Sequence, residues 1–167
     1  MAASLAVHYS SATDEWATPQ SFYDRLAAEF GGFDLDPCCL PVSAKAPQFY
    51  TPEDNGLASP WFGRVWMNPP YGRTIGDWTT RAREAVDTGH AELVVGLLPA
   101  RTDTVWWHRD VMESSEVRLV KGRLRFGAAI HGAPFPSAVV VWRDSRWSQR
   151  HARRAPLLTV MTAGIAA

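Results

Sequence analysis

Residues 65–71 read Val65-Trp66-Met67-Asn68-Pro69-Pro70-Tyr71, a short apolar run followed by a polar turn with two prolines. The apolar part is typical of a buried strand, and Gly72-Arg73 separate the turn from a helical pattern that begins at Ile75. The turn is therefore predicted to lie where a strand ends and a helix follows. In open α/β sheets, ligand sites lie at that edge.

The turn 68–71 offers two hydrogen-bond acceptors that can converge on one amino group. One is the side-chain oxygen of Asn68, and the other is the backbone carbonyl of Pro69, which is held because Pro70 has a fixed φ and restricts its neighbour. Adenine N6 is a poor nucleophile because its lone pair is delocalised into the ring, and two acceptors on its hydrogens draw the pair back onto nitrogen. Tyr71 can stack on the base. These four residues are predicted to catalyse methyl transfer to adenine N6.

An ordinary proline-rich turn is the alternative interpretation of this stretch. A motif of Asp, Asn or Ser, then two prolines and an aromatic residue, is expected by chance in roughly one sequence of this composition in a hundred. The strand before the turn and the helix after it favour the functional interpretation.

Composition indicates one globular domain. The chain has 167 residues, of which 46% are hydrophobic, and it can bury about 70% of its unfolded surface. Its apolar stretches are interrupted by proline and glycine, so neither a membrane span nor a secretory signal is predicted, and we expect a cytoplasmic protein. The adjacent Cys38 and Cys39 are expected to be reduced and partly buried. The histidines are scattered without zinc spacing, so no metal site is predicted.

Charge is divided unequally along a chain whose formal net charge is zero. Residues 1–90 carry 6 basic and 11 acidic side chains, whereas residues 91–167 carry 11 basic and 6 acidic ones. Two basic clusters stand out in the second half, namely Arg118, Lys121, Arg123 and Arg125, and then Arg143, Arg146, Arg150, Arg153 and Arg154. Such clusters are most often solvated surface, but contact with nucleic-acid phosphates also requires them. We expect nucleic-acid contact.

Periodicity predicts alternating helices and strands. Thr18 is expected to cap a helix that begins at Pro19 and ends at Gly31, and the next strand, 33–37, delivers Asp36 to its carboxyl end. Thr74 is expected to cap a helix that stops at Gly89. The remaining predictions are mostly loop at 38–60, strand at 92–98, helix from 102 or 103 through 111, and a hairpin-like set of strands at 117–120, 123–126 and 138–142.

This order favours a doubly wound α/β sheet, mostly parallel with an antiparallel edge. We expect a loose arm at 1–13, a single domain at 14–143, and a basic tail at 144–167 that could add a final strand.

Several stretches together resemble the small phage-encoded DNA N6-adenine methyltransferases, often called Dam-like. They follow that family's order over nearly all of residues 14–143, at 14–20, 33–37, 51–57, 68–73, 98–103, 121–126 and 134–138. The resemblance implies a class I S-adenosylmethionine-dependent (Rossmann-like) methyltransferase fold and S-adenosylmethionine as the methyl donor. It also implies double-stranded DNA as the partner, with the target base flipped out, and a place in the host cytoplasm.

Carried over residue by residue, the resemblance implies cofactor binding by Thr18-Pro19, Asp36-Pro37 and Asp54, the last through the donor's adenine amino group. Asp54 also suits a turn before Asn55-Gly56. Contacts with nucleic acid are expected from Tyr71, Arg73, Lys121, Arg123 and Phe126, although Phe126 equally suits a core strand.

One feature departs from the family's pattern. The glycines that usually follow the acidic residue and proline are replaced by Cys38-Cys39-Leu40-Pro41-Val42, so the donor's carboxylate end must be held differently. No residue is assigned to the donor's ribose, and the sequence predicts neither the target bases nor the oligomeric state. The same acceptor pair would suit adenine in RNA or a glutamine amide, and the fold could also serve a catalytically silent DNA-binding module.

Overall fold

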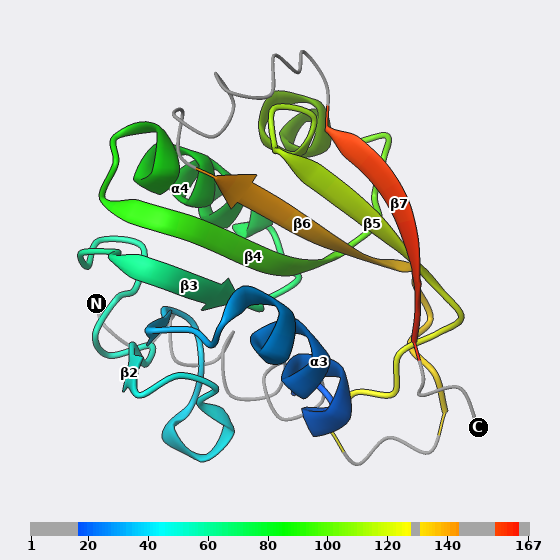
Figure 1. The fold of residues 1–167 in the computed structure, drawn as a ribbon, viewed down its shortest axis with the longest axis horizontal. Helices are drawn as coiled ribbons and strands as arrows, with labels where there is room; N and C mark the ends of the chain where they lie inside the picture. The colour runs from blue at the N-terminus through cyan, green and yellow to red at the C-terminus, as the bar shows by residue number, and fades with distance from the viewer. Residues whose placement is uncertain (1–16, 128–130, 144–155, 164–167) are drawn as a thin grey trace.

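The computed structural model describes residues 17–127, 131–143 and 156–163. Within these residues, seven strands form one sheet in the order β2-β1-β3-β4-β6-β5-β7 (Figure 1). The strands are β1 (Leu35–Asp36), β2 (Gln48–Phe49), β3 (Gly63–Met67), β4 (Ala91–Pro99), β5 (Glu116–Lys121), β6 (Ser137–Arg143) and β7 (Leu157–Thr162). The predicted fold class is confirmed. The antiparallel strand is β6, which lies between β4 and β5, while every other neighbouring pair is parallel.

The strand directions bring distant segments to one edge of the sheet. Strands β1, β3 and β4 are parallel, and β5 runs the same way because β6 is antiparallel to both β4 and β5. The carboxyl ends of these strands, at Asp36, Met67, Pro99 and Lys121, therefore share an edge. Ligand sites of α/β sheets form at this edge.

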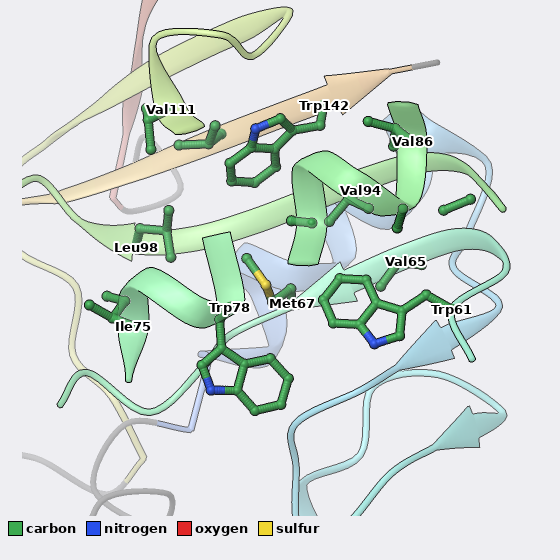
Figure 2. Packing of buried hydrophobic residues seen from close by; sticks show 14 of the residues in the cluster. Trp61, Val65, Met67, Ile75, Trp78, Val86, Val94, Leu98, Val111 and Trp142 are labelled. Atoms are coloured by element: carbon green, nitrogen blue, oxygen red, sulfur yellow. The ribbon is translucent and has the colours of Figure 1, made fainter. Parts of the chain in front are cut away.

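Two apolar layers cover the sheet. Helix α3 (Gln20–Phe30) packs on one face, while α4 (Ile75–Asp87) and the short π-helical turn η2 (Trp107–Val111) pack on the other. Strand β4 alternates between them: Val94 faces the α4 layer and Val95 the α3 layer, so β4 is buried on both faces as predicted. Figure 2 shows the α4 layer, where Trp61 and Trp78 stack with ring centroids 6.2 Å apart.

Both long helices begin close to the predicted positions, and α4 starts where it was expected. Helix α4 follows Thr74, and α3 ends at Gly31, which has a left-handed φ of 76°. The prediction that Thr18 caps α3 is wrong. The carbonyl of Pro19 accepts the first helical hydrogen bonds, and the Thr18 hydroxyl is bonded elsewhere. Among the described helices, none combines the length and apolar character required to cross a membrane.

Two further segments differ from the prediction, and a third agrees with it. Residues 123–126 do not form a strand: Leu124 and Phe126 are buried as an alternating pair, but the segment joins no ladder of the sheet. The helix expected from 102 or 103 begins later, with η2. Residues 38–60, predicted to be mostly loop, are mostly loop and contain the 3-10 turn Pro41–Ser43 and the short strand β2. Residues 1–13 and most of 144–167 lie outside the described residues, so the predicted domain boundaries stay predictions.

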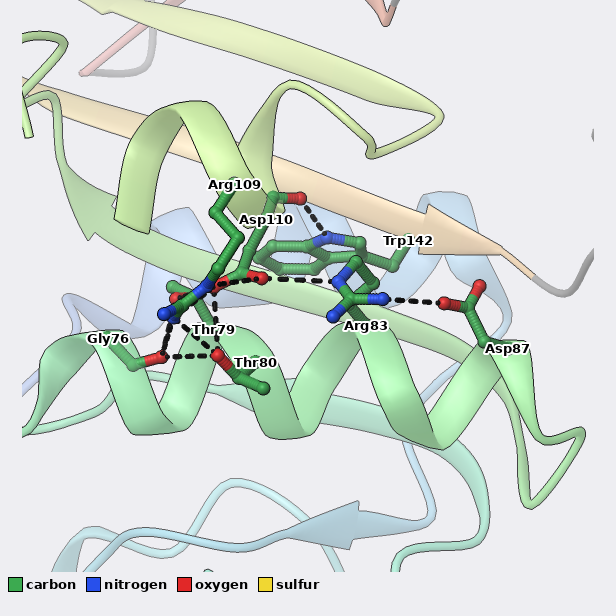
Figure 3. A network of polar contacts seen from close by, with 8 residues as sticks. All are labelled: Gly76, Thr79, Thr80, Arg83, Asp87, Arg109, Asp110 and Trp142. Atoms are coloured by element: carbon green, nitrogen blue, oxygen red, sulfur yellow. Dashed lines mark hydrogen bonds and ion pairs between the residues drawn. The ribbon is translucent and has the colours of Figure 1, made fainter. Parts of the chain in front are cut away.

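A buried carboxylate fastens η2 to α4. The side chain of Asp110 has no exposed surface, and its oxygens accept hydrogen bonds from Thr79 Oγ1 (2.8 Å), Arg83 Nε (3.1 Å) and Arg109 Nη2 (2.8 Å) (Figure 3). Its carbonyl accepts from Trp142 Nε1 at 2.9 Å. Burial alone raises the pKa of Asp110, but the donors from Arg109, Thr79 and Arg83 outweigh it, so the pKa lies below its ordinary range. The network joins helix α4, the turn η2 and strand β6.

Candidate active site

A cavity lies at the carboxyl ends of β1 and β3. Five residues predicted from the sequence line it, namely Thr18, Asp36, Asn68, Pro69 and Pro70, together with Ala17, Cys38, Cys39, Ser43, Lys45 and Trp66. The two strands are parallel neighbours, with Leu35 opposite Val65, and therefore the residues that follow them meet. Of the other predicted cofactor residues, Pro19 immediately precedes α3 and Pro37 is buried beside Asp36.

The carboxamide of Asn68 is held at both of its polar atoms. Its Nδ2 donates to Thr18 Oγ1 at 3.0 Å, and its Oδ1 accepts from the Tyr71 hydroxyl at 2.8 Å. The same hydroxyl also lies 3.0 Å from the carbonyl oxygen of Leu97. A phenol has one proton, so it can donate to Leu97 alone and leave Asn68 Oδ1 able to accept another donor. Burial raises the pKa of Tyr71 well above its ordinary value, which keeps the hydroxyl protonated.

The ring of Tyr71 belongs to an aromatic cluster beside Asn68. It packs edge-on against Phe126, with centroids 6.2 Å apart, and against Phe135, with centroids 5.4 Å apart. The next residue, Gly127, donates its N–H to the carbonyl of Ala17 at 2.8 Å, which fixes this segment beside the cavity. Phe126 is only 1% exposed, so its contact with a base stays a prediction. The role of Phe135 was not predicted, because a lone aromatic residue between two prolines carries no periodic signal.

Asp36 contributes a buried carboxylate to the cavity. It is 2% exposed and accepts the backbone N–H of Lys45 on Oδ2 (3.1 Å) and that of Cys38 on Oδ1 (3.4 Å). Burial raises the pKa of Asp36 to about 6, and the two backbone donors oppose that rise. The group is therefore mostly ionised at neutral pH, as a carboxylate whose charge is solvated by the protein backbone.

Asp54 lies outside the residues that line the cavity. Its carboxylate is exposed and accepts both the N–H and the hydroxyl of Thr51 at 2.8 Å, which lowers the pKa of Asp54 and closes a turn. The loop that follows does approach the site: a Cβ on Gly56 would lie 1.9 Å from the carbonyl oxygen of Pro37. A cofactor role for Asp54 stays a prediction.

Several residues that line the cavity were not predicted. Lys45 and Ser43 come from the aperiodic stretch after β1, where neither spacing nor a motif singles them out. Cys38 and Cys39 are free and buried, and burial raises the pKa of each thiol. They are neutral thiols at physiological pH and supply no thiolate nucleophile. Among the described residues, no group of three His, Cys, Asp or Glu side chains is arranged to hold a metal ion.

Comparison with known proteins identifies the family. A profile of the DNA N-6-adenine-methyltransferase (Dam) family matches residues 7–152. The chain belongs to this family. The resemblance found in the sequence is thereby confirmed.

Two relatives illustrate this similarity of the Dam-family chain. It is 35% identical over 106 residues to the DNA N-6-adenine-methyltransferase of Haemophilus phage HP1, covering 62% of this chain and 60% of the phage enzyme. It is 37% identical over 65 residues to the putative methyltransferase YfdM of Escherichia coli K12, covering 35% of this chain and 71% of that protein. The alignment thus spans about three fifths of the phage enzyme's length.

The cations of this Dam-family chain divide into two groups. Arg73, Lys121 and Arg123 are exposed, and in the described part of the chain no carboxylate pairs with them. Lys121 ends β5 and so lies at the same edge of the sheet as the cavity. Arg118 is different, because it is 13% exposed and bonded to Glu29 (2.5 Å) and Glu116 (2.9 Å).

The charge of Arg118 is therefore already paired within the protein, whereas Lys121 and Arg123 of the same cluster are exposed, and phosphate contact by this cluster stays a prediction. In the second cluster, Arg143 is half-buried over the ring of Phe30, and burial lowers its pKa. The other four members, Arg146, Arg150, Arg153 and Arg154, lie outside the described residues.

Proposed function

We propose that this protein transfers a methyl group from S-adenosylmethionine to the N6 amine of adenine in double-stranded DNA, acting on a flipped-out base. The observation that carries the proposal is the Asn68 carboxamide, held at a cavity where β3 ends, in a chain of the Dam family. The acceptor pair of Asn68 Oδ1 and the Pro69 carbonyl matches the two hydrogens of an aromatic amine.

The chemistry of the cavity fits the methyl donor. S-adenosylmethionine supplies an electrophilic methyl group on a sulfonium, and its methionine end carries an ammonium and a carboxylate. The cavity offers the buried carboxylate of Asp36, the cation of Lys45 and the hydroxyls of Thr18 and Ser43. The complementary charges support binding of the methionine end here.

Three residues of the turn, together with Thr18, have distinct tasks in the proposed reaction. When the target amine enters, the Tyr71 hydroxyl donates to Leu97 alone, which leaves Asn68 Oδ1 to accept one amine hydrogen. The Pro69 carbonyl accepts the other, and the nitrogen lone pair becomes available for in-line attack on the methyl carbon. The bond from that carbon to sulfur would break, with the neutral thioether as leaving group, and the amine would release its surplus proton to water. Thr18 keeps the carboxamide turned so that its oxygen, and not its nitrogen, meets the amine. Holding the reactants together contributes most of the rate.

DNA binding is proposed to rest on the cations at the same edge. Arg73 lies two residues after the turn, Lys121 ends β5 and Arg123 lies just beyond it, so all three can reach phosphates around a base in the cavity. Flipping the base costs a few kcal/mol, which contact with the ring of Tyr71 partly offsets. Phe126 packs edge-on against the ring of Tyr71 and supports it.

The test is to incubate the protein with methyl-labelled S-adenosylmethionine and three acceptors: duplex DNA of mixed sequence, RNA of the same sequence, and a glutamine-containing peptide. We expect label in DNA, recovered after digestion as N6-methyl-2′-deoxyadenosine. Label in RNA or peptide with none in DNA would move the chemistry to another polymer. DNA binding without methyl transfer to any acceptor would make the chain a silent binding module.

A further inference from the structure

The loop after Asp36 lacks the glycines that usually follow this position, yet it borders the cavity at residues 38, 39, 43 and 45. We propose that the Lys45 ammonium binds the carboxylate of the methyl donor's methionine end, while Asp36 faces the donor's ammonium. This inference rests on the proposed function, because it assigns a residue within the same donor site.

The backbone of this loop has few free donors for an anion. The N–H of Cys38 points to Asp36 Oδ1 (3.4 Å), that of Cys39 to the Tyr50 carbonyl (3.2 Å) and that of Leu40 to Ser43 Oγ (3.2 Å). The N–H groups of Ser43 and Lys45 are also bonded, and Pro41 has none. A glycine-rich loop binds anions with such N–H groups. Here the N–H groups of five loop residues are used within the protein, which favours a charged side chain as the partner of an anion.

Lys45 is the cation among the residues that line the cavity. Its backbone N–H donates to Asp36 Oδ2 at 3.1 Å, and its carbonyl accepts the Tyr23 hydroxyl, so the residue is fixed at the cavity from both sides of its backbone. The position of the ammonium therefore depends only on rotation about the four bonds of the lysine side chain.

The Lys45 ammonium has neutral partners. It donates to Gln20 Oε1 at 2.6 Å and lies 5.7 Å from the centroid of the Tyr23 ring. No ion pair of Lys45 occurs among the described residues. Gln20 is the first residue of α3, and the positive end of the helix dipole adds to the lysine charge. The Lys45 charge acts at longer range on the Asp36 carboxylate but forms no ion pair with it in the described part of the chain, so a ligand carboxylate can still bind the ammonium.

The two charges of the cavity form a matched pair for a zwitterion. The Asp36 carboxylate is buried and backbone-bonded, and Lys45 lines the same cavity, with its ammonium bonded to the neutral amide of Gln20. An amino-acid end group places one ammonium and one carboxylate on the same carbon, so it can satisfy both side chains at once. A ligand without the carboxylate would leave Lys45 as it is in the free protein.

The experiment measures binding by titration calorimetry, without DNA, for S-adenosylmethionine and its decarboxylated analogue. Wild type is compared with Lys45→Met and Lys45→Gln, which keep the backbone contacts, and with Lys45→Arg, which keeps the charge. We expect both neutral variants to lose about tenfold to a hundredfold in affinity for S-adenosylmethionine, the usual range for one charge-assisted hydrogen bond. Their affinity for the decarboxylated analogue should equal that of wild type, and Lys45→Arg should retain most of the binding.

Equal losses for the two ligands, or no loss for either, would overturn the role of Lys45 and leave the proposed function intact. Wild-type protein that binds neither ligand would instead overturn the proposed donor, and the inference with it. If wild type binds both ligands with the same affinity, the carboxylate has no partner in this protein and the inference is wrong, whatever the variants do.

Discussion

Replacing Thr18 with valine tests whether this residue orients the Asn68 carboxamide, for which we propose a catalytic role. Valine keeps the shape of threonine but removes Oγ1, the acceptor that lies 3.0 Å from Asn68 Nδ2. Thr18 is 5% exposed, so water has little room to replace the lost partner. An unsatisfied buried donor costs about 1–3 kcal/mol. If the carboxamide must keep its orientation in the transition state, the same free energy is added to the activation barrier, and kcat should drop by about fivefold to 150-fold.

The assay is steady-state methylation of duplex DNA by wild type, Thr18→Val and Thr18→Ser. Serine restores the hydroxyl, so Thr18→Ser should regain most of the lost kcat. Donor affinity is measured separately by calorimetry, because Thr18 also lines the cavity. A Thr18→Val variant with wild-type kcat would refute the positioning role. A serine variant as slow as the valine variant would refute it as well, since the loss would then follow from packing.

Three further predictions concern stability. Burial raises the pKa of Asp36 to about 6 from 3.8, so the folded protein binds the proton more tightly than the unfolded chain does. The resulting stabilisation, up to about 3 kcal/mol, is fully present below pH 4 and is lost as pH rises through 6. The free energies of urea unfolding of wild type and Asp36→Asn should therefore differ by an amount that changes with pH across that range. Gly56→Ala should destabilise by about 1–3 kcal/mol or more, because its Cβ would lie 1.9 Å from the Pro37 carbonyl, whereas Gly72→Ala meets nothing within 4 Å and should be neutral in thermal unfolding. Asp110→Ala should cost about 3 kcal/mol in urea unfolding, against roughly 0.3–0.5 kcal/mol for Asp87→Ala, since Asp110 is fully buried and Asp87 is 53% exposed.

Each of these comparisons can fail in a distinct way. A difference between wild type and Asp36→Asn that stays constant from pH 4 to pH 7 would show that the buried carboxylate has an ordinary pKa. Equal unfolding temperatures for the two glycine variants would mean that Gly56 is not packed closely against the carbonyl of Pro37. Equal costs for the two aspartate variants would remove the special role of the buried network.

Local sequence rules were enough to predict the edge of the sheet that holds the site. Asp36 and Asn68 each follow an apolar run, and the prediction that both lie at carboxyl ends of strands needed only the alternation of strands and helices. Their proximity depends on β1 and β3 being neighbours, which the family's fold implied and the parallel pairing confirms.

Other parts of the site depend on contacts that no local pattern encodes. Thr18 before Pro19 matches a helix cap, and only the fold reveals that its hydroxyl meets Asn68, fifty residues away. Lys45 reaches the cavity because its backbone N–H bonds to Asp36 across an irregular loop. Residues 123–126 alternate like a strand because Leu124 and Phe126 are buried, although the segment joins no ladder.

The most direct test of the central claim compares wild type and Asn68→Ala in single-turnover methylation of adenine in duplex DNA, with donor affinity verified for both. The account predicts similar donor affinity and a methylation rate lower by about 10²–10³, the usual effect of losing one preorganised polar partner. An Asn68→Ala variant that binds the donor and methylates adenine N6 at the wild-type rate would contradict it.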